Sequence, residues 1–376
     1  MASDFEQLYE RYESDNRIAQ IHQQLSQSGT TRLQLSGIKG ALDTFVLLAS
    51  QQKTKAPFLF IADDKETAAY LFNNLENLTK DNPILFLPDS FKRPTAFDQL
   101  NETNTLQRTE VINKISNSKN NEIIVTYPEA LFEKVIAPKE LKKAQITIEV
   151  NEKIDIDTII SVMVEYGFSR EDFVYEPGQF SIRGGIVDIF SYGNEWPYRV
   201  DLFDDEVESI KTFDPLTQLS QRNIGRVSIV PNMNTQFDPE DKVSILKVLS
   251  ENCVVWLQDF NMLLEKLNIC VTKAEEIASQ ISSEIRPIQK LFEEKAFIVP
   301  GDTIKELEAF STVFVTSKKL PFEPDEVIKF NVQPQPSFNK NFELLINQLK
   351  DNEKKRITNY IFTDNAKQIE LSLIHI

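Results

Sequence analysis

The chain has 376 residues, more than one ordinary hydrophobic core accommodates, which predicts two or three domains. It carries 57 acidic and 41 basic residues, and the net charge of −16 disfavours direct nucleic-acid binding, which depends on clustered lysine and arginine. With only two histidines and two cysteines, neither histidine-dependent catalytic triads nor histidine- or cysteine-rich metal sites are expected. No apolar run is long enough to span a membrane and the acidic start is unlike a signal peptide, so a soluble, cytoplasmic protein is expected.

Helical and strand patterns alternate in the first third of the sequence. An amphipathic helix is predicted over residues 3–25, and Asp63 or Asp64 is expected to cap a helix at 64–79. The other predicted elements of this region are strands at 32–35, 57–62, 84–87 and 122–126 and helices at 41–52 and 103–117. Strands separated by helices predict a mostly parallel, doubly wound α/β sheet.

The pattern changes near residue 145. A strand at 146–150, a helix at 156–165 and a run of short alternating strands predict an α+β domain that contains an antiparallel meander. Beyond it, helices are predicted at 238–251, 260–268, 272–294 and 339–349, and strands at 253–257, 313–315 and 327–331. We therefore expect three parts, namely an α/β domain at 1–145, an inserted docking domain at 146–232 and the second part of the α/β module at 233–376. A final strand at 360–363 and an uncapped helix start indicate a chain cut short within a larger protein.

The loop at residues 37–44 joins a predicted strand to a predicted helix, which is the context of a P-loop. In the signature GxxxxGK[ST], Gly37 and Thr44 are in register, whereas Leu42 replaces the second glycine and Asp43 replaces the lysine. The aspartate places an anion where a cation would neutralise phosphate, and no acidic pair follows the strand at 122–126 to hold magnesium. An ordinary strand-to-helix turn and a degenerate P-loop both fit this pattern, and ATP hydrolysis is not expected.

The segment at 174–220 alternates with a period of two, which places arginines and aspartates together on one face of a meander. One interpretation is that these charges simply pair across strands on a solvent-exposed face. The other is that Arg170, Arg183 and Arg199, with the aromatic Phe190, form a protein-docking patch, because these residue types are enriched at interface hot spots. The carboxylates of the segment lack catalytic or metal-ligand spacing, so a docking surface is expected in place of an active site.

The stretches PGQFSIRGGIVDIF, PYRVDLFDDEVESI and FDPLTQ resemble the domain shared by the excinuclease protein UvrB and the transcription-repair coupling factor (Mfd). The stretch FLPDSFKRP at 86–94 and the loop at Gly37 extend the resemblance over most of the chain. UvrB needs an intact phosphate loop, so the departures at Leu42 and Asp43 favour the amino-terminal, UvrB-homologous module of the bacterial coupling factor. That resemblance implies a degenerate P-loop, RecA-like domain with the α+β domain inserted in it.

The resemblance further implies a non-catalytic module that docks the excinuclease protein UvrA and starts nucleotide-excision repair at stalled RNA polymerase. It assigns Arg183, Arg199 and Arg170 as contacts with Phe190 as their apolar neighbour, and it implies that Arg183→Glu abolishes docking while leaving the fold intact. No cofactor is expected for this chain, because ATP, RNA polymerase and DNA belong to domains further along in the family. The alternatives are a divergent ATP-dependent helicase, supported by any nucleotide affinity lost on mutating Lys39, and a UvrB-like protein that binds DNA.

Overall fold

The computed structural model describes residues 4–79, 83–93, 95, 97, 101–117, 121–192, 194, 196–231, 241–280, 296–333, 336–339 and 341–360. Two compact units, Met1–Asn331 and Val332–Ile376, are described separately. The first unit holds a parallel sheet and an antiparallel meander, so the chain is a mixed α/β protein. Within the described ranges, no helix combines the length and apolarity that crossing a bilayer requires.

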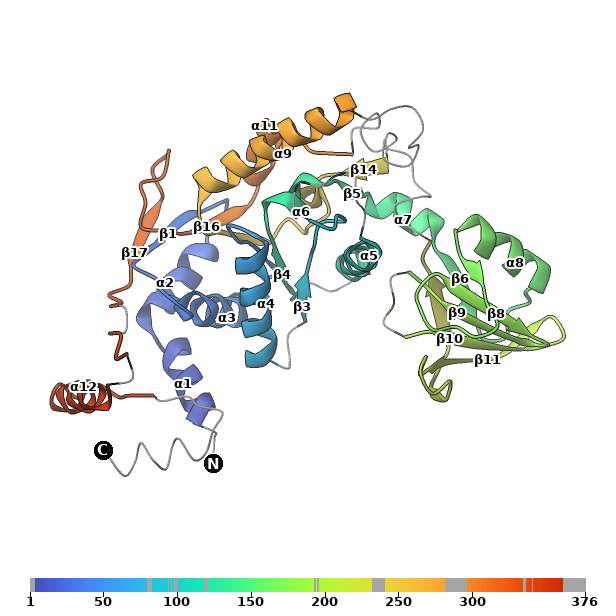
Figure 1. Cartoon of the computed structure of the whole chain (residues 1–376), viewed down its shortest axis with the longest axis horizontal. Helices are drawn as coiled ribbons and strands as arrows, with labels where there is room; N and C mark the ends of the chain where they lie inside the picture. The colour runs from blue at the N-terminus through green and yellow to red at the C-terminus, as the bar shows by residue number, and fades with distance from the viewer. Residues whose placement is uncertain are drawn as a thin grey trace. The chain divides into compact units, whose positions relative to one another are not determined.

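Seven parallel strands form the larger sheet (Figure 1). In spatial order they are β17 (Glu326–Lys329), β1 (Arg32–Ser36), β16 (Ser311–Val315), β15 (Val254–Leu257), β2 (Phe58–Ile61), β4 (Ile123–Thr126) and β3 (Ile84–Phe86). Every residue of β2, β4 and β15 is buried, which is typical of parallel strands covered on both faces. The strands come from sequence on both sides of residues 146–232, so one sheet is built from two separated stretches of chain.

Helices precede or follow most of these strands. They are α1 (Asp4–Glu13), α2 (Asn16–Leu25), α3 (Leu42–Thr54), α4 (Lys65–Leu78), α5 (Glu102–Asn117), α6 (Pro128–Phe132), α7 (Pro138–Ala144), α9 (Phe260–Gln280) and α11 (Pro300–Leu307). Asp64 caps α4 as predicted, because its carboxylate accepts a hydrogen bond of 2.8 Å from the amide of Thr67. The helix predicted at 3–25 is instead two helices, since Asp15 has extended backbone angles and caps α2 through the amide of Arg17.

Two other helix predictions were wrong in part. The described residues of the segment 238–251 are not an α-helix, because Lys242–Val243 forms strand β14 against β5 (Val135–Ile136) and Ile245–Lys247 forms a short 3₁₀ helix. The two helices predicted at 260–268 and 272–294 begin as the single helix α9, which contains neither glycine nor proline to interrupt it. Residues 281–294 lie outside the described ranges.

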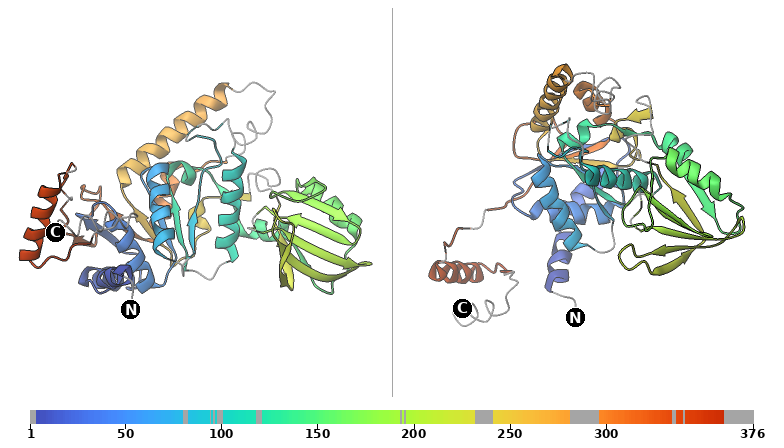
Figure 2. Two further views of the ribbon diagram at one scale, coloured as in Figure 1. Left: turned by 60° about the horizontal axis from the view of Figure 1, so that its bottom comes forward. Right: turned by 45° about the vertical axis from the view of Figure 1, so that its right-hand side comes forward.

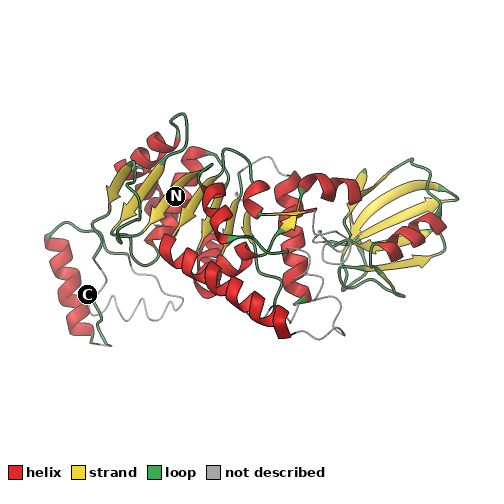
Figure 3. Ribbon diagram, turned by 90° about the horizontal axis from the view of Figure 1, so that it is seen from above, coloured by secondary structure: helices red, strands yellow, loops and turns green. Residues whose placement is uncertain are grey.

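The second sheet lies within residues 146–231, here called the inserted domain (Figures 2 and 3). Its spatial order is β12 (Ser220–Ile224), β11 (Glu206–Phe213), β10 (Tyr198–Phe203), β9 (Ile186–Phe190), β8 (Gln179–Arg183) and β7 (Ser169–Arg170). All neighbours are antiparallel except β7 and β8. The chain enters through β6 (Ile146–Glu149) and leaves through β13 (Arg226–Ile229), which pair with each other. Both ends of the insertion are thereby held together.

One face of this sheet forms the core of the inserted domain. The two-residue alternation predicted for the meander is confirmed, because Phe180, Val187, Ile189 and Val200 all point into a single apolar cluster. Helix α8 (Ile156–Glu165) covers that face with its own buried side chains. The opposite face is therefore the one left for charged residues and for any partner.

The second unit contains α12 (Phe342–Lys354), which begins three residues later than the helix predicted at 339–349. Asn341 caps it by accepting a hydrogen bond from the amide of Leu344. None of the residues of α12 is buried. Apart from Tyr360, which is described and is not in a strand, the strand predicted at 360–363 and the helix start after it lie outside the described ranges.

Candidate functional site

The polar face of the six-stranded sheet is organised around Asp188 in β9, which is fully buried. Its carboxylate accepts hydrogen bonds from arginines on both neighbouring strands. Arg183 Nη2 lies 2.5 Å from Oδ2, and Arg199 Nε and Nη2 lie 2.7 and 2.9 Å from Oδ1 and Oδ2. We call Arg183, Asp188 and Arg199 the arginine–aspartate triad.

The triad also holds two loops against this face. Arg183 Nη1 donates to the carbonyl of Asp172 at 2.9 Å, in the loop before β8. Arg199 Nη1 donates to the carbonyl of Gln218 at 3.1 Å, in the loop after β11. The hydrogen bond with Asp188 raises the pKa of Arg199. The two guanidinium groups therefore link the sheet to these two loops through hydrogen bonds.

This geometry changes the roles assigned to the two arginines. Cross-strand pairing of arginine with aspartate, one of the two interpretations of the sequence, is confirmed, but the carboxylate of Asp188 is buried and does not lie on a solvent-exposed face. The side chain of Arg199 is only 15% exposed, and that of Arg183 is 36% exposed. A glutamate at position 183 would face the buried carboxylate of Asp188, so the expectation that Arg183→Glu leaves the fold intact is not compatible with the structure.

The other two predicted contacts, Phe190 and Arg170, differ in how far they are buried. Phe190 is 6% exposed and forms a small apolar cluster with Val174 and Phe213. Its assignment as an apolar surface contact is therefore wrong, because the loop before β8 folds back and places Val174 over it. Arg170, at the edge strand β7, is exposed as predicted.

The part of the polar face near the hairpin turns is open. Phe203, the last residue of β10, is 77% exposed, and Ile186 at the start of β9 is half-buried. Lys211 forms an ion pair of 2.6 Å with Asp201 on the adjoining strand. We call Arg183, Ile186, Asp201, Phe203 and Lys211 the open face.

Sequence reasoning placed Phe203 on this face but did not select it as a contact. The available signal was its position, two residues beyond Asp201 and directly before the acidic turn at Asp204. A residue at the end of a hairpin strand has few neighbours to cover it, so an aromatic side chain there becomes a candidate contact.

The loop that begins at Gly37 has its own internal hydrogen bonds. The amide of Gly37 donates to Ser317 Oγ at 2.9 Å. Leu42 begins α3, and Asp43 Oδ1 accepts the amide of Thr44 at 2.6 Å and its hydroxyl at 3.2 Å. Three donors of this segment, the amides of Gly37 and Thr44 and the hydroxyl of Thr44, are thus bound to oxygens of the chain itself.

Asp43→Asn is expected to stabilise the protein against unfolding at neutral pH. Burial raises the pKa of Asp43 despite the hydrogen bonds from Thr44. A carboxyl group whose pKa is raised on folding contributes stability in its protonated form, and that contribution is lost as the pH rises through the folded pKa. Asparagine does not titrate and keeps the Oδ1 acceptor, so its advantage should grow from about pH 4 upward and then level off. Urea unfolding of both proteins across this range measures the effect, and parallel pH profiles would contradict it.

Acidic groups also follow β2 and β15 at the carboxyl edge of the parallel sheet. Burial, with the neighbouring charge of Asp259, raises the pKa of Asp63. Asp259 is itself paired with Lys318. In the described part of the chain, no three His, Cys, Asp or Glu side chains are arranged to hold a metal ion.

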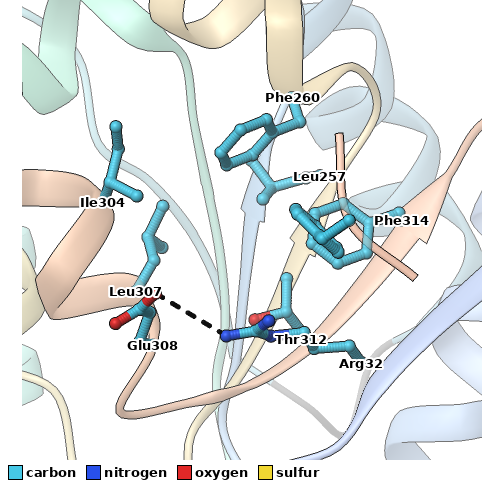
Figure 4. Close-up of a pocket in the computed structure, with 9 residues that line it drawn as sticks. Arg32, Leu257, Phe260, Ile304, Leu307, Glu308, Thr312 and Phe314 are labelled. Atoms are coloured by element: carbon cyan, nitrogen blue, oxygen red, sulfur yellow. Dashed lines mark ion pairs between the residues drawn. The ribbon is translucent and has the colours of Figure 1, made fainter. Parts of the chain in front are cut away.

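A cavity of about 70 Å³ lies between α11 and the strands β15 and β16 (Figure 4). Its lining is mainly apolar and includes Leu257, Phe260 and Phe314. Arg32 and Glu308 form an ion pair of 3.7 Å at its edge, shown as the dashed line in Figure 4. A space of this size and polarity is too small for a nucleotide.

Comparison with known proteins matches the inserted domain to a described family. A family model described as the UvrB interaction domain matches residues 146–234. The transcription-repair-coupling factor of Bacillus subtilis is 28% identical over 303 residues, covering 78% of this chain and 26% of the relative. That of Staphylococcus aureus is 31% identical over 222 residues, covering 57% of this chain and 18% of the relative. The UvrABC system protein B of Thermodesulfovibrio yellowstonii is 29% identical over 212 residues, or 53% of this chain and 31% of the relative.

These similarities place the chain among proteins that carry a UvrB interaction domain. Within that group, it is related to the N-terminal, UvrB-like module of transcription-repair-coupling factors, as the sequence motifs indicated. The chain spans about a quarter of the length of the Bacillus subtilis relative, 26%.

Proposed function

We propose that this chain is a non-catalytic recruitment module that docks the excinuclease protein UvrA and starts nucleotide-excision repair at stalled RNA polymerase. The match of residues 146–234 to the UvrB interaction domain is the observation that carries the proposal. Relatives named as transcription-repair-coupling factors support the transcription-coupled context, and relatives named as UvrABC system protein B support a role in DNA repair.

The open face is the proposed docking surface. Phe203 is an exposed aromatic side chain at the end of a hairpin strand, and aromatic residues are enriched at interfaces. Arg183 and Lys211 lie on the same face in fixed positions, because Asp188 and Asp201 hold them. Arg199 is mostly buried and is proposed to position the surface without contacting the partner.

The part of the chain that forms the seven-stranded parallel sheet, here called the parallel-sheet domain, is proposed to be a degenerate P-loop, RecA-like domain without ATPase activity. Leu42 and Asp43 stand in place of the glycine and lysine of the signature, and the loop amides of Gly37 and Thr44 are bound within the chain. No cofactor is proposed for this chain. ATP, RNA polymerase and DNA are proposed to bind regions corresponding to the rest of the longer relatives.

A UvrB-like protein is the second candidate, favoured by the 29% identity over 212 residues to one UvrABC system protein B. That function requires nucleotide binding at the loop that begins at Gly37. A nucleotide affinity that is lost on Lys39→Ala would support it over the recruitment module.

Isothermal titration of the wild-type chain with purified UvrA tests the proposed function. We expect binding, and we expect Phe203→Ala to weaken it by at least tenfold, because truncating an interface hot spot has effects of that size. Tyr70→Ala, which truncates a 65% exposed aromatic on α4, is the matched control and should bind as wild type. Absence of binding by the folded wild-type chain would overturn the proposal.

A further inference from the structure

Two aromatic side chains stand exposed in the loop between β7 and β8, on the polar side of the sheet. Phe173 is 48% exposed and Tyr175 is 52% exposed, and their ring centroids lie 6.5 Å apart. Val174 between them is fully buried against Phe190 and Phe213. The loop is therefore anchored through its middle residue while both flanking rings face outward.

The backbone of this loop is fixed at several points. The amides of Tyr175 and Glu176 donate to Gln179 Oε1 at 2.8 and 3.0 Å. Gln218 Nε2 donates to the carbonyl of Val174 at 3.0 Å, which ties the loop to its neighbour. Rings held by a rigid backbone lose little conformational entropy on binding, so this pair is well suited to anchor a partner.

The aromatic pair is continuous with the open face. The guanidinium carbon of Arg183 lies 5.0 Å from the centre of the Phe173 ring, and its Nη1 donates to the carbonyl of Asp172. Arg183 is opposite Ile186 in the pairing of β8 with β9, and Ile186 is opposite Asp201 of β10, two residues before Phe203. A track of neighbouring side chains thus runs from Phe203 through Ile186 and the charged Arg183 to Phe173 and Tyr175.

Exposed carboxylates border this track at both ends. They are Glu171, Asp172 and Glu176 near the aromatic pair and Asp204, Asp205 and Glu206 near Phe203. Carboxylates beside the exposed Phe173 and Tyr175 rings are complementary to a surface that carries lysine and arginine around an apolar pocket.

From these contacts we infer that Phe173 and Tyr175 form a second anchor of the docking surface. They bind an apolar pocket of UvrA that is flanked by basic side chains. Both aromatic residues lie outside the stretches that the family motifs contain. This inference rests on the proposed function, because it takes UvrA as the occupant. The triad supports it structurally, since Arg183 joins the aromatic pair to the open face.

Calorimetry of UvrA with Phe173→Ala, Tyr175→Ala and the double variant tests the inference. We expect the double variant to bind at least tenfold more weakly than wild type, and wild-type binding to weaken as salt concentration rises. Tyr70→Ala again serves as the control for loss of an exposed ring. Thermal unfolding of each variant checks the fold. Tyr175→Ala is expected to keep the fold, because the ring that lies against Arg183 is that of Phe173.

The outcomes separate the inference from the proposed function. If wild type binds and Phe203→Ala weakens binding while the double variant binds within twofold of wild type, the second anchor is wrong and the recruitment function stands. If binding is unaffected by salt, the basic character assigned to the partner pocket is wrong. If the folded wild-type chain does not bind UvrA, the proposed function is wrong, and the second anchor is wrong with it.

Discussion

Arg199→Glu is expected to lower the free energy of unfolding of the inserted domain by about 3–5 kcal/mol, the usual effect of breaking a buried ion pair. The substitution leaves Asp188 without its bidentate partner and adds a second carboxylate beside it. It also removes the hydrogen bond to the carbonyl of Gln218, which frees the loop after β11. Chemical unfolding followed by circular dichroism measures the change.

Two reversals on the same sheet provide the comparison. Arg183→Glu should destabilise less than Arg199→Glu, because the Arg183 side chain is more exposed and makes one contact to Asp188 instead of two. Arg222→Glu, at an exposed position of β12, should change stability by less than about 0.5 kcal/mol. Equal stability of all three variants would contradict a structural role for the triad and would make Arg199 a candidate for direct contact again.

Gly37→Ala is expected to destabilise the parallel-sheet domain by about 2–6 kcal/mol, from backbone strain and steric overlap together. Gly37 has a φ of +81°, and a Cβ there would lie 2.0 Å from the carbonyl oxygen of Phe330. Gly40→Ala is the matched control, because its φ of +61° is similar but nothing lies within 4 Å of the added Cβ. It should cost only about 1–2 kcal/mol.

The same experiment separates a structural glycine from a nucleotide-binding one. Magnesium-ATP at millimolar concentration should leave the unfolding midpoint of the wild-type chain unchanged, because a ligand stabilises a protein only when it binds the folded state. A midpoint raised by ATP would show that the chain binds nucleotide, and Gly37→Ala as stable as Gly40→Ala would contradict the steric role of Gly37.

Local sequence pattern was sufficient for much of the fold. Helix α8 lies at the predicted residues, and the strands of the parallel sheet lie within a few residues of their predicted ranges. The failures come from contacts distant in sequence. Residues 242–243 have a helical pattern but pair with β5, about a hundred residues earlier in the chain. The first helix is divided because the local cap at Asp15 competes with continuation of the helix.

Only part of the candidate site could be predicted from the sequence. Alternation gave the correct face for Arg183, Asp188 and Arg199, but it could not show that two loops cover part of that face. Those loops bury Phe190 and accept hydrogen bonds from both arginines. Alternation also placed Phe203 correctly, yet only its position at the open end of a hairpin shows that it is exposed.

Hydrogen–deuterium exchange of the chain with and without UvrA tests the central claim most directly, namely that the polar side of the inserted domain is the docking surface. Complex formation should slow exchange of the amides at 171–176, 184–186 and 203–206, which lie in exposed turns and in the aromatic loop. The amides of β1, α3 and the loop that begins at Gly37 should exchange at unchanged rates. Protection confined to the parallel-sheet domain, with none in the inserted domain, would contradict the account.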